Sequence, residues 1–302
     1  MASDALDGKV AIVTGAGRGV GRAEALELAK AGARVVVNDF GAGLHGGRDD
    51  NPADSVVAEI KELGAEAVAD YGDVADFGQA HDLVQRAIDT FGQLDVLVNN
   101  AGFLRERMIF NMSEDEWDDV IRVHLKGHFC MSRWASAYWR DTAKANGTDV
   151  YGRVINTSSE AFLNGSVGQP NYAAAKAGIV QLTLATAHAL RKFGVTANAI
   201  CPRARTRMTE DLGFDAVDNG LDVFAPENVS PLVAFLASPA AQPVSAQVFV
   251  VYGRMITLLG SPRVEARFDA PARWTLDEVT HQLSTFFGER DPLKNFGTNV
   301  PG

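Results

Sequence analysis

Three residues in the middle of the chain have the types and spacing of an acid–base centre. Tyr172 and Lys176 are four residues apart, so they project from the same face of any helix that carries both. A tyrosine hydroxyl, with a pKa near ~10, is a poor base at neutral pH, and an adjacent ammonium lowers that pKa by stabilising the phenolate. Ser159 follows an apolar run, 153–158, which is typical of a buried strand. Its hydroxyl would hold a substrate oxygen opposite Tyr172.

This pair is weak evidence on its own, because a tyrosine and a lysine one helical turn apart often occur by chance. The alternative is a helix with one packed tyrosine and one exposed lysine whose methylene groups cover apolar surface. The elements that would bring a reactant to Tyr172 and Lys176 must decide between these interpretations.

A glycine-rich turn near the amino terminus predicts a phosphate-binding site. The run 9–14 is apolar and rich in β-branched residues, and a helical pattern covers 22–31. Between a strand and a helix, glycines let the backbone approach a pyrophosphate, while N–H groups at the helix start point toward it. A turn that needs glycines only for its shape is the alternative. The proposed cofactor contacts in this turn are Gly15, Arg18, Gly19, Val20 and Gly21.

An acidic residue at the end of the second strand favours NAD over NADP. The strand 33–37 leads into Asp39, at about the distance expected for a carboxylate that binds the adenine ribose hydroxyls. An ionised Asp39 would repel the phosphate that distinguishes NADP, although Arg18 in the glycine turn would favour that phosphate. An ordinary turn or cap residue is the alternative for Asp39.

Later strand ends supply further candidate cofactor contacts. Apolar runs at 65–69 and 94–98 alternate with helical patterns at 53–63 and 75–91. Such alternation predicts a doubly wound α/β fold with a mostly parallel sheet, whose ligand lies at the carboxyl ends of the strands. With strands at 153–158, 195–200 and 247–251, we expect seven strands. The candidates at these ends are Asp73, Val74, Asn99, Ala101 and Gly102.

Composition excludes several other classes of protein. The 302 residues carry a net charge of -10, which argues against nucleic acid or an anionic membrane surface as the main partner. Cys130 and Cys201 lie in apolar surroundings and are interpreted as small buried residues, so we expect a reducing, cytoplasmic setting and no metal site. No stretch reaches the length of a membrane span or has the pattern of a signal peptide.

As a set, these motifs resemble the short-chain dehydrogenase/reductase superfamily. The likeness rests on the glycine turn, on 99–102 (Asn-Asn-Ala-Gly), on Ser159 and on Tyr172-x-x-x-Lys176, and it covers about residues 7–252. It implies one Rossmann domain over 1–252, a nicotinamide cofactor and hydride transfer to or from a CH–OH carbon. It also implies Tyr172 as general acid/base, Lys176 as the group that lowers its pKa and binds the nicotinamide ribose, Ser159 as a substrate contact, and a homodimer or homotetramer.

A narrower likeness concerns the substrate. Residues 37–41, 123–127 and 206–209 resemble the (3R)-hydroxyacyl-CoA dehydrogenase unit of peroxisomal multifunctional enzyme type 2 and its bacterial relatives. The implied reaction is NAD-dependent oxidation of a (3R)-hydroxyacyl-CoA. A steroid or other secondary-alcohol dehydrogenase, an NADPH-dependent 3-oxoacyl reductase and a non-catalytic NAD-binding protein remain as alternatives.

Two positions depart from the usual pattern of the superfamily. His124 stands where most members have an asparagine, so its part in the proton relay is open between a proton shuttle and a single hydrogen bond to backbone. Arg203 replaces the usual glycine after Pro202, while Thr206 matches the residue that binds the carboxamide. A further hypothesis is that Arg203, Arg205 or Arg207 binds the phosphates of coenzyme A. The alternative is a loop whose arginines are solvated or paired with acidic residues of the chain.

The last fifty residues, 253–302, have no counterpart in the motifs above. Thr275 and Glu278 form the pattern of a capping box, and an apolar stripe follows them at helical spacing. We expect this extension to pack on the domain or across a subunit interface, and we assign it no chemistry.

Overall fold

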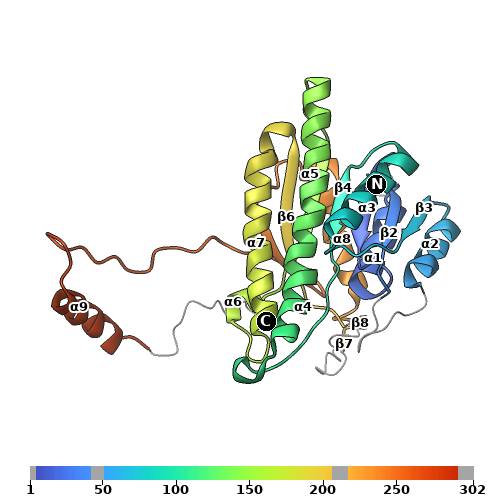
Figure 1. The fold of residues 1–302 in the computed structure, drawn as a ribbon. Helices are drawn as coiled ribbons and strands as arrows, with labels where there is room; N and C mark the ends of the chain where they lie inside the picture. The colour runs from blue at the N-terminus through green and yellow to red at the C-terminus, as the bar shows by residue number, and fades with distance from the viewer. Residues whose placement is uncertain (1–4, 42–50, 206–216, 292–302) are drawn as a thin grey trace.

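A computed structural model describes residues 5–41, 51–205 and 217–291 of the chain. It has three layers, with a central β-sheet covered by helices on both faces, and a carboxyl-terminal arm that leaves this body (Figure 1). The fold class predicted from the alternation of strands and helices is therefore confirmed.

Seven strands of the main sheet run parallel, in the order β3-β2-β1-β4-β5-β6-β9, and β10 pairs antiparallel with β9 at the edge. The order reverses between β1 and β4, which is where doubly wound sheets bind their ligands. The bounds of these strands are β1 Val10–Thr14, β2 Arg34–Asn38, β3 Ala67–Asp70, β4 Val96–Asn99, β5 Gly152–Thr157, β6 Val195–Pro202, β9 Val248–Tyr252 and β10 Met255–Leu258.

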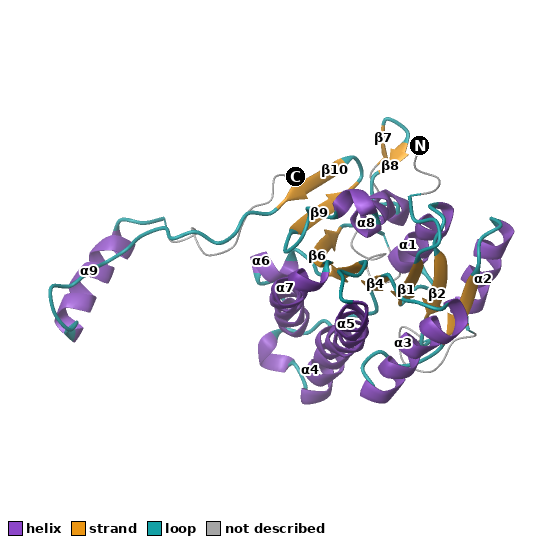
Figure 2. Cartoon of the chain, turned by 90° about the horizontal axis from the view of Figure 1, so that it is seen from above, coloured by secondary structure: helices purple, strands orange, loops and turns teal. Residues whose placement is uncertain are grey.

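The helices divide into two groups, one on each face of the sheet (Figure 2). One group comprises α1 (Gly19–Lys30), α2 (Pro52–Glu62) and α8 (Ser230–Ala237). The opposite group comprises α3 (Phe77–Phe91), α4 (Glu114–Ile121), α5 (Gly127–Asn146) and α7 (Pro170–Leu190), and a short helix, α6 (Ala161–Asn164), precedes α7.

Alternating side chains of the strands fill a separate core on each face. In β1, Ala11 and Val13 belong to the core beneath α1, α2 and α8, whereas Val10 and Ile12 belong to the core beneath α3, α5 and α7. Both sets are fully buried, so the strand reads as a continuous apolar run, as expected for a parallel sheet covered on both faces.

The sheet has one strand more than the seven expected from sequence. Strand β10 follows Tyr252 through a turn in which Gly253 adopts a positive φ of 51°. Its apolar side chains are partly exposed, because an edge strand has a neighbour on one side only, and this obscured the pattern of a buried strand. A small hairpin of β7 (Val217–Asp218) and β8 (Leu221–Asp222) was not expected either.

The carboxyl-terminal arm is described up to residue 291. Helix α9 (Leu276–Gly288) begins at the predicted capping box, in which Thr275 and Glu278 each bond the other's backbone N–H. It stands away from the body of the molecule and buries none of its residues (Figure 1). Packing of α9 on its own domain is therefore not observed, and contact across a subunit interface stays a prediction.

Cys130 and Cys201 are both buried and unbonded, as interpreted from their apolar surroundings. In the described part of the chain, no helix has the length and apolarity needed to cross a membrane. Within the same residues, no group of three or more histidine, cysteine or acidic side chains is arranged to hold a metal ion.

One buried acid conflicts with the apolar core around it. Glu24, in α1, is completely buried, and neither of its carboxylate oxygens has a hydrogen-bond partner among the described residues. Burial raises the pKa of Glu24 to about 8, because the charged form loses its hydration. The folded chain therefore holds a proton on Glu24 that the unfolded chain releases above its ordinary pKa of 4.5.

This acid should lower stability as the pH rises from about 5 to 8. We predict that Glu24→Met, an apolar residue of similar length, raises the free energy of unfolding, and that its advantage over the natural chain grows across this window. The gain should amount to a few kcal/mol at most, since a tenfold change in protonation corresponds to about 1.4 kcal/mol. Urea unfolding at pH 5 and pH 8 measures it. An equal effect of the substitution at both pH values would contradict the buried, protonated state.

Candidate functional site

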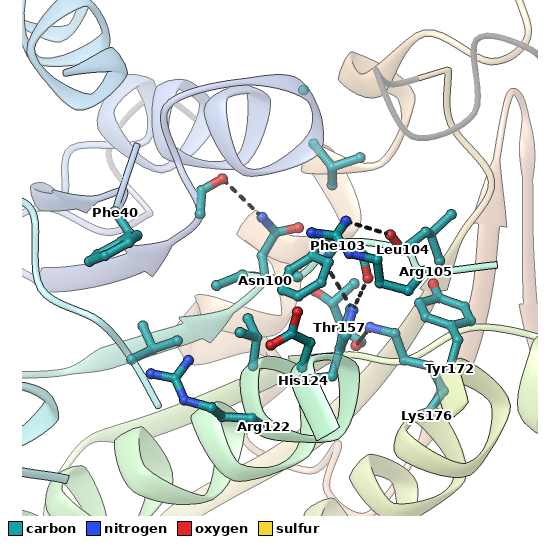
Figure 3. Close-up of a pocket in the computed structure, with 18 of the residues that line it drawn as sticks. Phe40, Asn100, Phe103, Leu104, Arg105, Arg122, His124, Thr157, Tyr172 and Lys176 are labelled. Carbon is teal, nitrogen blue, oxygen red and sulfur yellow. Dashed lines mark hydrogen bonds between the residues drawn. The ribbon is translucent and has the colours of Figure 1, made fainter. Parts of the chain in front are cut away.

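A cleft of about 700 Å³ opens at the carboxyl ends of the parallel strands, at the β1–β4 reversal. The glycine turn and Asp39 line it, and so do Tyr172 and Lys176, so it joins the two motifs found in the sequence. Figure 3 shows Tyr172 and Lys176 in this cleft. Of the predicted site residues, those that line the cleft are Gly15, Arg18, Gly19, Val20, Asp39, Asp73, Val74, Ala101, Gly102, His124, Tyr172 and Lys176.

The glycine turn is shaped by close backbone contacts. A Cβ added at Gly15, which has a φ of 61°, would lie 2.8 Å from the Cα of Ala101. At Gly21, which does not line the cleft, a Cβ would lie 2.4 Å from the carbonyl oxygen of Gly15. Both positions therefore exclude larger residues. Helix α1 begins at Gly19, directly after the turn, and its first two residues, Gly19 and Val20, line the cleft.

Thr14 and Asn100 tie the first and fourth strands together at the switch point. The hydroxyl oxygen of Thr14 accepts hydrogen bonds from the N–H groups of Asn100 (3.0 Å) and Ala101 (3.1 Å). In return, the amide of Asn100 donates to the carbonyls of Thr14 (3.1 Å) and Gly15 (3.2 Å). The 99–102 motif therefore fixes the floor of the cleft.

Asp39 lies where the second strand ends, and its carboxylate lines the cleft. One oxygen accepts a hydrogen bond from the N–H of Gly17 at 2.9 Å, and the other from the N–H of Gly41 at 2.8 Å. The residue therefore holds the glycine turn against the end of β2. A carboxylate placed beside this turn can accept hydrogen bonds from ribose hydroxyls.

Asp73 and Val74 line the cleft, as predicted. The Asp73 carboxylate accepts a hydrogen bond from the N–H of Ala75 (2.8 Å) and forms an ion pair with Arg122. Arg122 also lines the cleft, so the site carries a charge pair that the sequence did not indicate.

Tyr172 and Lys176 lie side by side on α7, as their spacing predicts (Figure 3). The Lys176 amine lies 5.2 Å from the centre of the Tyr172 ring and donates a hydrogen bond to the carbonyl of Thr157 at 2.6 Å. Lys176 is 2% exposed, which rules out the alternative of a solvent-exposed lysine.

Burial dominates the protonation of this pair. It raises the pKa of Tyr172 to about 12, against a hydrogen bond from Ser159 that lowers it, and it lowers the pKa of Lys176 to about 7. Burial acts on both groups, because the amine loses hydration in the same surroundings as the phenol. That Lys176 lowers the pKa of Tyr172 stays a prediction.

Ser159 lies two residues beyond the end of β5, next to Tyr172 but not on the wall of the cleft itself. Its hydroxyl oxygen accepts a hydrogen bond from the N–H of Ala161 at 3.2 Å, and its side chain lies close enough to Tyr172 to lower the pKa of that phenol. The structure therefore brings Ser159 near Tyr172 and Lys176.

His124 lies within a π-helical turn, Arg122–Lys126, that joins α4 to α5. Its ring meets the Tyr172 ring edge-on at 5.2 Å, and its Nε2 lies 2.7 Å from the carbonyl oxygen of Phe103. A Cβ on Gly102 would lie 2.0 Å from this ring, so the glycine makes room for the histidine. Burial first, and then the charge of Lys176, keep the pKa of His124 well below 6.5, so the imidazole is neutral at physiological pH.

Asn99, a further predicted residue, does not line the cleft. Asn99 is buried beneath the cleft, where its amide donates to Asn156 (2.9 Å) and Ser132 (3.2 Å), and Asn100 is the asparagine that lines the cleft. Thr206 lies outside the described residues. So does Arg207 in the arginine-rich loop.

The other two arginines of that loop are paired within the chain. Arg203 binds Glu160 with both ends of its guanidinium group, at 2.5 and 2.8 Å, and Arg205 binds Asp222 at 2.6 Å. These ion pairs favour the interpretation of an internally paired loop over contact with coenzyme A phosphates.

Sequence reasoning missed the wall formed by residues 103–107, all of which line the cleft. Asn171 holds this segment in place, because its amide donates to the carbonyls of Arg105 (3.0 Å) and Glu116 (2.8 Å). Asn171 is completely buried and directly precedes Tyr172. Asn171, next to the tyrosine, was the one feature of the sequence that could have indicated this wall. Its partners, Arg105 and Glu116, are too distant in the sequence to be predicted from it.

The chain is similar to known proteins along most of its length. The family model described as short chain dehydrogenase matches residues 9–215. The chain is 52% identical to the hydroxyacyl-CoA dehydrogenase ChsB1 of Mycobacterium tuberculosis, over 96% of this chain and 92% of that protein. It is 44% identical to the peroxisomal multifunctional enzyme type 2 of Mus musculus, over 78% of this chain but only 30% of that longer protein.

A solved structure shares the whole architecture. The crystal structure of a short chain dehydrogenase from Mycobacterium avium is 51% identical, covers 95% of this chain and 97% of its own, and superposes with a TM-score of 0.85. The resemblance suggested by the motifs is thereby confirmed. The chain belongs to the short-chain dehydrogenase family and is an oxidoreductase that acts on CH–OH groups with a nicotinamide cofactor.

Proposed function

We propose that this protein oxidises a (3R)-hydroxyacyl-CoA to the 3-oxoacyl-CoA with NAD as hydride acceptor. The observation that carries the proposal is a cleft lined by Asp39, Tyr172 and Lys176, with Ser159 next to Tyr172. The relative from M. tuberculosis, matched along nearly its full length, is named for the same reaction class.

The residues of the chain fit a dinucleotide. The glycine turn forms a cradle that any Cβ at Gly15 or Gly21 would fill, and the Asp39 carboxylate lies beside it. Gly19, Arg18, Val74 and Ala101 complete the wall along which the two nucleotides would lie. When bound, the oxidised nicotinamide accepts the hydride and adds a positive charge near the tyrosine. Asp39 disfavours the additional phosphate of NADP by charge repulsion.

In the proposed mechanism, Ser159 and Tyr172 hold the substrate hydroxyl. The Tyr172 phenolate would take the hydroxyl proton, and the cofactor would supply the acceptor for the hydride from the same carbon, so that the carbonyl forms as the O–H and C–H bonds break. Lys176 would hold the nicotinamide ribose and, when charged, would stabilise the phenolate. His124 is neutral and would therefore carry no charge during the reaction. Its role would be to hold the backbone at Phe103 and the ring of Tyr172 in place.

The surface beside the cleft supports a substrate with a long apolar part. The N–H of Arg107, a cleft residue, donates to the carbonyl of Gly168 at 2.8 Å, which brings two loops together at the mouth. These loops expose four apolar side chains: Met108, Ile109, Phe110 and Val167. An acyl chain could cover them. A sterol would fit the same surface, so a secondary-alcohol or steroid dehydrogenase is the second candidate.

We also propose a homodimer or homotetramer in a reducing, cytoplasmic setting. Phe129 on α5 and Phe77 on α3 are exposed and stack at 6.3 Å between ring centres, which leaves an apolar surface for another subunit. Two buried free thiols fit a reducing compartment.

Replacing the general base tests the assignment of Tyr172. Tyr172→Phe should lower kcat for hydroxyacyl-CoA oxidation by about a thousandfold, because a positioned acid or base contributes roughly 10²–10⁴ in rate. The dissociation constant for NADH, measured by fluorescence titration, should stay within about twofold. Tyr138→Phe, on α5, is the matched control and should be neutral. A kcat near that of the natural enzyme would contradict the role of Tyr172.

Removing the carboxylate at the end of β2 tests the cofactor. Asp39→Ser should improve kcat/KM with NADP relative to NAD by at least about tenfold, since a pair of charges near a protein surface is worth a few kcal/mol. Initial rates with both cofactors at one substrate concentration measure the ratio. If the natural enzyme already prefers NADP, Asp39 does not select the cofactor.

The neutrality of His124 predicts the shape of the pH profile. Because its pKa is held well below 6.5, His124→Asn should leave the profile of kcat between pH 6 and 9 unchanged in shape, whatever the effect on its height. Steady-state rates across this range provide the test. An inflection near pH 6.5 that is present in the natural enzyme and lost in the variant would show that His124 titrates during catalysis.

A further inference from the structure

Arg203 has a structural environment that explains why an arginine replaces the glycine usual after Pro202. Its guanidinium binds the Glu160 carboxylate through two parallel hydrogen bonds, and the two side chains are only 26% and 14% exposed. The guanidinium also lies 4.5 Å from the centre of the Tyr252 ring. A paired, stacked and half-buried arginine is far better fixed than one on a solvated loop.

These contacts join the ends of three neighbouring strands. Glu160 follows β5, Arg203 follows β6, and Tyr252 is the last residue of β9. The N–H of Arg203 also donates to the carbonyl of Val251 at 3.0 Å. The pair therefore bridges the carboxyl-terminal edge of the sheet on the substrate side of the cleft.

Ser159 lies between two anchors in this region. On its amino-terminal side, the Ser158 hydroxyl donates to the carbonyl of Lys176 (2.9 Å) and the Ser158 N–H donates to the carbonyl of Ile200 (2.7 Å). On its carboxyl-terminal side, among the described residues, Glu160 forms an ion pair with Arg203. The four-residue helix α6 follows, and the N–H of Ala161 at its start donates to the Ser159 hydroxyl. We take the ion pair as the tie that joins this short segment to the end of β6.

We infer that the Arg203–Glu160 pair is a positioning device for Ser159, which holds the serine side chain beside the Tyr172 phenol. The inference deepens the proposed function and rests on it. Arg203 touches neither reacting atom, so it acts through Glu160 and the Ser159 backbone. A bidentate pair suits this task because it fixes orientation as well as distance.

Two sets of variants test the positioning role. Arg203→Ala and Glu160→Ala should each lower kcat about tenfold, with the KM for NAD and the NADH dissociation constant within about twofold of the natural enzyme. The double variant should be no slower than either single one, because both remove the same interaction. Arg203→Lys keeps the charge but not the two-pronged geometry, so it should recover part of the rate.

Arg267→Ala is the matched control, since Arg267 makes a similar two-bond pair with Asp269 on the exposed arm. It should leave kcat unchanged. An unchanged kcat in Arg203→Ala, independent effects that multiply in the double variant, or a parallel loss of NADH affinity would each overturn the positioning role.

Hydrogen exchange separates this inference from the proposed function. Amides of residues 161–165 should exchange at least about tenfold faster in Arg203→Ala, and those of β1 should not change. Hydrogen exchange needs no substrate. It therefore tests whether the Arg203–Glu160 pair holds the segment after Ser159 even if the natural enzyme oxidises no hydroxyacyl-CoA. Unchanged exchange at 161–165 would show that the pair does not hold the Ser159 segment.

Discussion

The site depends on a lysine amine held in a nearly dry position. Lys176 is 2% exposed and is fixed by one strong hydrogen bond to the carbonyl of Thr157, at the end of β5. Such burial is costly for a cation, and it leaves the amine able to gain or lose its proton near neutral pH. The neighbouring Tyr172 shares the same surroundings, so any charge that enters the cleft acts on both groups with little screening.

The parallel sheet explains why such distant residues meet. The parallel strands all end at the same edge of the sheet, so the glycine turn after β1, Asp39 after β2 and Ser158 after β5 border one cleft. The rigidity of the edge comes from side-chain ties across strands. Thr14 with Asn100 fixes the switch point, and Asn171 fixes the outer wall to the start of α7.

Sequence patterns predicted the layers, the parallel sheet and the cleft contacts that lie within short motifs. Tyr172, Lys176 and the glycine turn were accessible because their spacing is local. The upward shift of the Tyr172 pKa could not be predicted from the sequence, because it depends on how far the folded chain removes the phenol from water. The wall at 103–107, the Arg122–Asp73 pair and the edge strand β10 depend on contacts between distant segments, for which the sequence offers no periodic signal.

The central claim is that the buried pair becomes reactive through charge brought into the cleft. The most direct test is an ultraviolet titration of the Tyr172 phenolate, taken as the difference between the natural chain and Tyr172→Phe, with and without saturating NAD. We predict ionisation only in strongly alkaline solution without NAD, and a midpoint shifted toward neutral pH with NAD. Lys176→Met should reduce that shift. The same midpoint in both conditions would contradict the account.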